Sequence, residues 1–110
     1  MKITVIIPTL NIGGAEKLTV NLINDWINKG HQIELLLLQK EGPLLQELNN
    51  KNLIIHNLNS KNTLFSFYPL YKFFNQNKID IAWGNMSPLT SIIIFAWVLS
   101  GKKGKLFVTE

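Results

Sequence analysis

The 110-residue sequence contains no cysteine, and all 11 of its basic residues are lysine. The lack of cysteine excludes a disulfide framework and a thiolate metal site. Without arginine, bidentate recognition of phosphate or carboxylate is not expected. No group of His, Asp and Glu residues has the spacing of metal ligands, so we expect no metal ion.

The sequence also shows neither a targeting signal nor a patch typical of nucleic-acid binding. The amino-terminal apolar run is too short for a signal peptide and is interrupted by Pro8, which predicts a cytoplasmic protein. The net charge is +4, but most lysines are scattered and only Lys102, Lys103 and Lys105 lie close together. An ordinary solvated surface is therefore expected rather than a nucleic-acid interface.

The familiar phosphate-binding and triad motifs fit poorly. A dinucleotide fingerprint needs a third spaced glycine and an acid after the second strand, whereas here no third glycine follows Gly14 and that strand ends in Gln39-Lys40. The segment 101–104 lacks the spacing and the Ser/Thr of a Walker A motif. No Ser/His/Asp set is supported by position.

What the sequence does contain is a strand, a glycine pair and a helix start near its beginning. The apolar run 3–7 is typical of a strand buried on both faces, and Pro8 ends it. Gly13 and Gly14 can adopt positive φ and have no Cβ, so a ligand can approach their backbone. If Gly13 is the N-cap, the Glu16 carboxylate can fold back onto free N–H groups. This arrangement predicts an anion site suited to phosphate.

The residues Val5-Ile6-Ile7-Pro8, followed by Gly13-Gly14-Ala15-Glu16, resemble the amino-terminal domain of family-4 glycosyltransferases of the GT-B type. The resemblance implies transfer of a sugar from a nucleotide-sugar donor to the hydroxyl of a glycan or lipid-linked acceptor, with retention and without a metal or other cofactor. It also implies a bacterial polysaccharide pathway. The donor phosphates would contact Gly13, Gly14, Ala15 and Glu16.

In that family a carboxyl-terminal domain holds most of the donor. We therefore expect residues 1–110 to form an incomplete, acceptor-side domain whose donor-binding domain is missing or supplied by another chain. The acceptor-side cleft would include Asn11, Asn85, Met86, Ser87 and Glu110. Many relatives carry a catalytic-site His after the strand that corresponds to residues 105–109, so the catalytic residues are not assigned. The alternative is a non-catalytic α/β module, either a truncated remnant or a subunit completed by a separate donor-domain chain.

Alternating apolar runs and helical patterns predict the fold. Strands are expected at 3–7, 32–38, 53–56, 79–83 and 105–109, with helices at 15–29, 44–49, 69–77 and 88–99. This alternation predicts one Rossmann-like α/β domain with a parallel sheet of order 3-2-1-4-5 and helices on both faces. Ligands then bind beyond the carboxyl ends of the first and fourth strands, where the glycine turn and the loop 84–87 would converge.

Two helices and two histidines have predicted structural roles. The first helix should bury a stripe made of Ala15, Leu18, Leu22, Ile23, Trp26 and Ile27. The apolar helix 89–99 is too short to span a bilayer, so it should pack against the sheet; contact with a membrane or another domain is the alternative. His31 and His56 are expected to be structural, with His56 capping its strand or facing water.

Six aromatic residues crowd one segment, namely Phe65, Phe67, Tyr68, Tyr71, Phe73 and Phe74. Lys61, Lys72 and Lys78 flank or interrupt this run. Two interpretations stay open: the rings pack on the sheet, or some of them meet the interface of an anionic bilayer at the inner face of the cell membrane.

Overall fold

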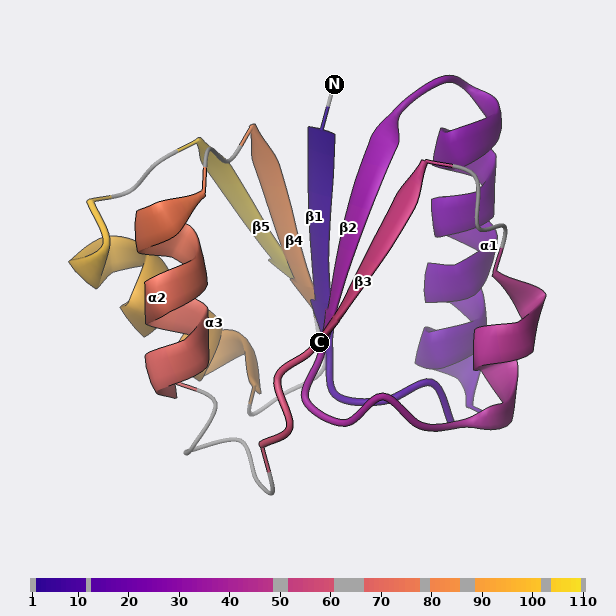
Figure 1. Cartoon of the computed structure of the whole chain (residues 1–110), viewed down its shortest axis with the longest axis horizontal. Coiled ribbons are helices and arrows are strands. Elements are labelled where there is room, and N and C mark those ends of the chain that lie inside the picture. Colours follow the sequence, from indigo (N-terminus) through magenta and orange to yellow (C-terminus); the bar gives the residue numbers. More distant parts are fainter. Residues whose placement is uncertain are drawn as a thin grey trace.

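The structure is a computed structural model that describes residues 2–11, 13–48, 52–60, 67–77, 80–85, 89–101 and 104–109. Within these residues, five parallel strands form one sheet of order β3-β2-β1-β4-β5 (Figure 1). The predicted α/β Rossmann-like class and strand order are confirmed.

The strands are β1 (Lys2–Ile7), β2 (Gln32–Leu37), β3 (Leu53–Asn57), β4 (Ile81–Asn85) and β5 (Lys105–Thr109). The helices in the described residues are α1 (Gly14–Asn28), η1 (Pro43–Glu47), α2 (Phe67–Gln76) and α3 (Leu89–Leu99), and η1 is a 3-10 helix. The fourth strand runs two residues further than predicted, so Gly84 and Asn85 belong to β4 and not to its exit loop.

Helices cover both faces of the sheet, as predicted. On one face, Ile3, Val5 and Ile7 of β1 join a core formed with α1 and η1. On the other face, Ile6 joins a core formed with α2 and α3. Figure 1 shows these two layers on opposite sides of the strands. Because successive strand side chains point to opposite faces, the continuous apolar run of β1 is buried on both.

Helix α1 is rotated relative to the predicted stripe. Its buried residues are Thr19, Val20, Ile23 and Ile27, whereas Leu18 is 55% exposed. The Thr19 hydroxyl donates a hydrogen bond to the Ala15 carbonyl oxygen at 2.8 Å, which satisfies this buried polar group. The predicted burial of Leu18 is therefore wrong.

On the other face, the aromatic segment and α3 bury only part of their apolar surface. Phe73 and Phe74 of α2 are buried, so these rings pack on the sheet, while Tyr68 is 66% exposed. Helix α3 packs through Ile93 and Ala96, and its outward side is exposed. Phe65 lies outside the described residues. Among the helices that the structure describes, none combines the length and apolar character needed to cross a membrane.

Candidate functional site

The candidate site lies at the carboxyl edge of the sheet, which is at the bottom of Figure 1. Ile6 of β1 is paired with Gly84 of β4, so these two strands end side by side. The chain order reverses between them: β2 and β3 lie on one side of β1, whereas β4 and β5 lie on the other side. Open α/β sheets bind ligands at such a reversal.

The glycine turn of residues 13–14 leads directly into α1. Gly13 is the N-cap, with φ −172° and ψ 165°, which is extended backbone. The glycines with positive φ in the described residues are Gly30, Gly42, Gly101 and Gly104. Neither glycine of the turn uses positive φ, so what glycine provides there is the absence of a side chain.

At Gly13, that space is taken by the side chain of Glu16. A Cβ atom on Gly13 would lie 2.6 Å from the Glu16 Oε1 atom, so the carboxylate is folded back over the turn. The helix begins here, since the Lys17 N–H donates to the Gly13 carbonyl oxygen at 3.0 Å. A carboxylate at this position stabilises the positive end of the helix dipole.

Gly14 is different, because its surroundings are open. It is exposed, and a Cβ atom there would meet no heavy atom within 4 Å. A group from outside can therefore approach the first helical peptide closely. Within the expected phosphate site at residues 13–16, an anion can therefore reach the backbone at Gly14, whereas the Glu16 side chain covers the backbone at Gly13.

The loop before the turn is held rigidly by the loop that follows β2. The Leu10 N–H donates to the Glu41 carbonyl oxygen at 3.0 Å, and the Leu44 N–H donates to the Leu10 carbonyl oxygen at 3.1 Å. Gly42 has φ +115°, and a Cβ atom there would overlap the Leu10 carbonyl group. The sequence analysis did not identify Gly42 as a site residue, although the Gly-Pro pair signals a turn.

The other predicted site residues are only partly placed. Asn11 is exposed, and its Nδ2 atom donates to the Thr9 Oγ1 atom at 3.0 Å. Asn85 is the last residue of β4, at the same edge of the sheet as the glycine turn. Met86, Ser87 and Glu110 lie outside the described residues. The structure thus brings the glycine turn and the end of β4 to one edge.

Three shallow cavities are present elsewhere, with volumes of about 340, 330 and 580 Å³. None of these three is lined by residues 13–16. The candidate site is therefore described by the exposed backbone at Gly14 and not by any of these three cavities. In the described part of the chain, no three His, Asp or Glu side chains are grouped so that they could hold a metal ion.

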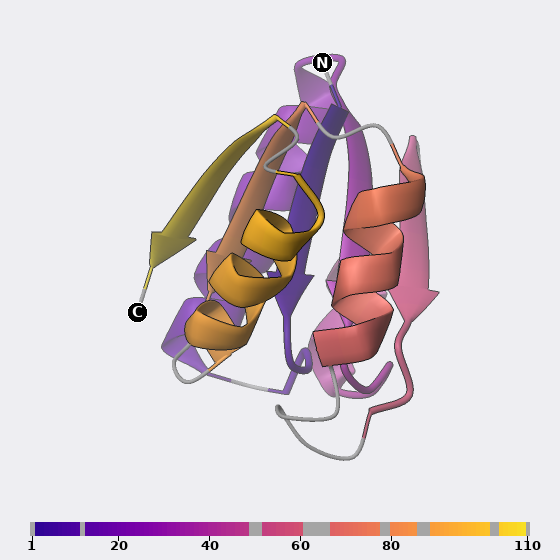
Figure 2. The same ribbon diagram turned by 90° about the vertical axis from the view of Figure 1, so that its left-hand side faces the viewer.

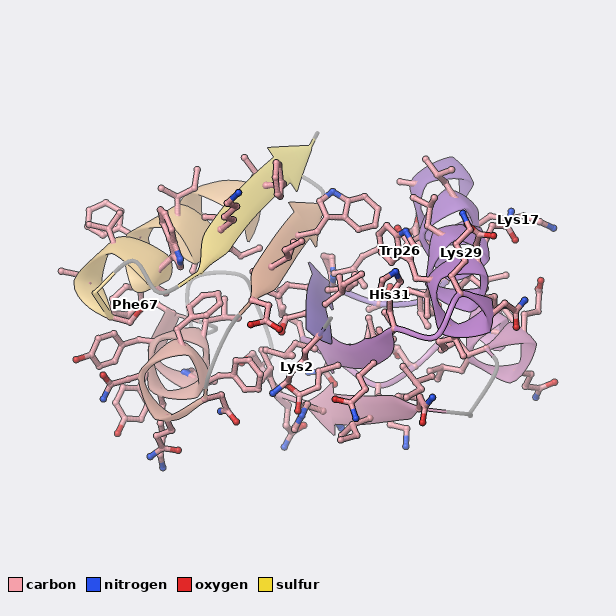
Figure 3. All side chains as sticks on the ribbon, turned by 90° about the horizontal axis from the view of Figure 1, so that it is seen from above. Lys2, Lys17, Trp26, Lys29, His31 and Phe67 are labelled. Atoms are coloured by element: carbon pink, nitrogen blue, oxygen red, sulfur yellow. The ribbon has the colours of Figure 1, made fainter. Side chains whose placement is uncertain are left out.

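A buried charge cluster was missed by the sequence analysis. Glu34 of β2 is 8% exposed; its Oε2 atom lies 3.1 Å from Lys2 Nζ, and its Oε1 atom lies 3.5 Å from His56 Nε2. Figure 3 shows Lys2 at the amino end of the sheet. His56 also packs edge-on against Phe73, with ring centroids 5.4 Å apart, rather than simply capping its strand. This cluster joins three neighbouring strands and lies away from the glycine turn.

Comparison of the chain with protein-family models, with characterised proteins and with solved structures finds no significant match.

Proposed function

We propose that this chain is the acceptor-side domain of a retaining GT-B glycosyltransferase resembling family 4. In this proposal the complete enzyme transfers a sugar from a nucleotide-sugar donor to a hydroxyl of a glycan or lipid-linked acceptor. The turn at residues 13–16 contacts the donor phosphates, and the surface near Asn11 and the end of β4 faces the acceptor.

The observation that supports this function is the open backbone at Gly14, at the N-terminus of a 15-residue helix and beside the chain reversal. Unpaired N–H groups and the helix dipole favour an anion at this point. The dipole contributes only about 0.3–1 kcal/mol to a charge at an exposed site. Phosphate alone should therefore bind with millimolar affinity, and other groups must hold the rest of the donor.

Those other groups are assigned to a second domain or a second chain. Sugar transfer requires stabilisation of negative charge that develops on the leaving phosphate. The glycine turn supplies backbone N–H groups for this purpose. Among the described residues, no ion pair or hydrogen bond of the structure holds a lysine side chain at this turn. We expect no sugar transfer by the purified 110-residue chain, and turnover of any nucleotide sugar would contradict this division of roles.

Ligand-observed NMR with a panel of nucleotide sugars tests the proposal. We expect weak binding that is lost in Gly14→Val, because the valine side chain fills the open space above the first helical peptide. The control is Asn28→Val, which places the same side chain on an exposed position at the other end of α1. Equal binding by both variants, or no binding of any nucleotide sugar by the wild type, would contradict the proposal.

A second candidate function is a non-catalytic α/β module. The position of the Glu16 carboxylate favours it, because a negative charge beside the helix N-terminus interacts favourably with the helix dipole without any ligand. The two functions differ in one measurable respect. A donor-binding turn gains phosphate affinity when the Glu16 charge is removed, whereas a purely structural turn only loses stability.

A further inference from the structure

The side of α3 that points away from the sheet is apolar and uncovered. The large exposed residues on this side are Ile94 (41%), Phe95 (64%), Val98 (43%) and Leu99 (56%). They lie opposite Ile93 and Ala96, through which the helix packs on the sheet. The outward side of a surface helix normally carries charged residues, whereas α3 contains none. Single apolar residues are ordinary on a surface, but a contiguous apolar patch marks an interaction site.

Helix α2 extends the same outward surface. It packs against α3, and Figure 2 shows the two helices side by side in front of the sheet. Tyr68, which is 66% exposed, and Lys72 lie four residues apart on the exposed side of α2. A tyrosine ring and a lysine with a four-carbon stem both suit the boundary between an apolar phase and water. Another helix of this layer would pack beside α3, so it would leave the outward side uncovered.

The charges of the chain are divided between the two helical layers. Helices α2 and α3 contain no acidic residue, and Lys72 is their one charged residue. On the opposite face of the sheet, α1 and η1 carry three acidic residues against one lysine, Lys17. The sequence shows the same division, because residues 48–109 contain seven lysines and one acid, Asp80. The layer with the exposed apolar side is therefore the layer that an anionic surface attracts.

We infer that the outward side of α2 and α3 binds the surface of an anionic lipid bilayer. The apolar side of α3 enters the boundary between headgroups and acyl chains, and Lys72 contacts lipid phosphates. The inference does not rest on the proposed function, since it concerns the outward side of a helical layer and not the glycine turn.

A bilayer is favoured over a protein partner by the shape and the charge of this surface. None of the three cavities is lined by a residue of α3. Protein interfaces depend on anchor side chains that fill pockets, whereas a fluid bilayer adapts to a helix that has none. A second copy of the chain would bring two layers of the same charge together, which disfavours self-association.

The dimensions of α3 predict weak, reversible binding. Its 11 residues, at about 1.5 Å each, give a length of about 16 Å, which suits a helix lying in the bilayer surface. From a full burial of about 150–250 Å² for an aromatic side chain, Phe95 exposes roughly 100–160 Å². An apolar anchor of this size binds marginally by itself, so the attraction of lysine to anionic lipid is also needed. Added salt should therefore weaken the binding.

Flotation of the 110-residue protein with lipid vesicles is the first test. One set of vesicles contains phosphatidylglycerol and phosphatidylcholine, and the other contains phosphatidylcholine alone, in lipid series that reach about 1 mM. We expect binding to the anionic vesicles at low ionic strength, loss of this binding on added salt, and little binding to the neutral vesicles. No binding to the anionic vesicles, or equal binding to both sets, would overturn the inference.

Matched variants locate the binding surface. Phe95→Ser should lower the ratio of bound to free protein at least tenfold, because it removes a ring that is 64% exposed. Phe107→Ser should leave the ratio unchanged, because Phe107 is 54% exposed on the opposite face of the sheet, beside Trp26 of α1. Lys72→Glu should weaken binding more than Lys17→Glu, although both change the net charge equally. Equal loss in the two members of either pair would contradict the assignment.

A fluorescent label tests the same surface even if a serine variant fails to fold. The chain has no cysteine, so Leu99→Cys and Phe107→Cys each introduce a single thiol at positions that are 56% and 54% exposed. An environment-sensitive label on Leu99→Cys should shift its emission to the blue when anionic vesicles are added, and the label on Phe107→Cys should not. No shift at residue 99, or the same shift at both positions, would contradict the inference. Light scattering that shows a lipid-free oligomer, lost in Phe95→Ser, would assign this side to a second copy and overturn it.

Discussion

Glu16→Gln should tighten phosphate binding at the glycine turn while it weakens the helix that forms the turn. The substitution keeps the size of the side chain and removes its negative charge. The Glu16 Oε1 atom lies 2.6 Å from the position that a Gly13 Cβ would occupy. We take a phosphate at the Gly14 backbone to lie about 5 Å from this carboxylate for the Coulomb estimate. In a water-like dielectric, two unit charges at this distance repel by about 0.8 kcal/mol.

Removing this repulsion should increase phosphate affinity about fourfold at low ionic strength. The increase should shrink as salt is added, since salt screens exposed charges. The free energy of unfolding should fall by about 0.3–1 kcal/mol, because the carboxylate no longer interacts with the helix dipole. The assays are an NMR titration with inorganic phosphate and thermal unfolding of the same samples.

Asp25→Asn is the control, because it removes one negative charge from the opposite end of α1. Asp25 is exposed and forms an ion pair with Lys29 at 3.0 Å. Its loss changes the net charge as Glu16→Gln does, but leaves the glycine turn intact. Weaker phosphate binding by Glu16→Gln, or the same gain in both variants, would refute the local repulsion.

Three further tests use other substitutions, two of them with a matched control. Gly42→Ala should lower the free energy of unfolding, measured with urea, by about 2–4 kcal/mol, because the alanine combines strain at positive φ with overlap of the Leu10 backbone. Its control, Gly14→Ala, should change the free energy of unfolding by less than about 1 kcal/mol. Lys2→Met should lower the free energy of unfolding by about 1–2 kcal/mol, because it leaves the buried Glu34 carboxylate with only His56 beside it. Its control, Lys29→Met, breaks the exposed ion pair with Asp25 and should lower the free energy of unfolding by less than about 0.5 kcal/mol in the same assay. If the aromatic segment meets anionic bilayers, Lys72→Glu should weaken vesicle co-sedimentation at low salt, and equal recovery with neutral vesicles would leave only the packing explanation.

The order of the sheet could be predicted from sequence because its signals are local. The run 3–7, the apolar residues 33–38 and the breakers Pro8 and Gly30 mark strands and helix ends. Right-handed crossovers then limit the arrangement of alternating strands and helices. Gly30 follows the end of α1 with φ +93°, a left-handed conformation that favours glycine.

The missed features depend on contacts between distant residues. A Glu among the apolar residues of β2 is a visible signal, but its partners Lys2 and His56 are defined only by strand pairing. The buried side of α1 depends on how the helix lies on the sheet, which sequence periodicity gives only approximately. For the same reason, the pattern of α3 showed that the helix is apolar but not that one side would stay uncovered.

The site itself was predicted in position but not in conformation. The strand, glycine pair and helix start were all visible, and they lie at the predicted edge of the sheet. The sequence could not show that Glu16 occupies the space at Gly13, because several side-chain positions satisfy the same capping pattern. The clamp at Gly42 depends on the approach of two loops that are separated along the chain.

The central claim is that the glycine turn binds the phosphates of a donor, and amide mapping by NMR tests it most directly. Isotope-labelled protein would be titrated with inorganic phosphate and with a nucleoside diphosphate. The account predicts saturable shifts at the amides of Gly13, Gly14, Ala15 and Glu16 at millimolar ligand, with larger effects from the diphosphate. Shifts confined to other regions, with these four amides unmoved, would contradict it.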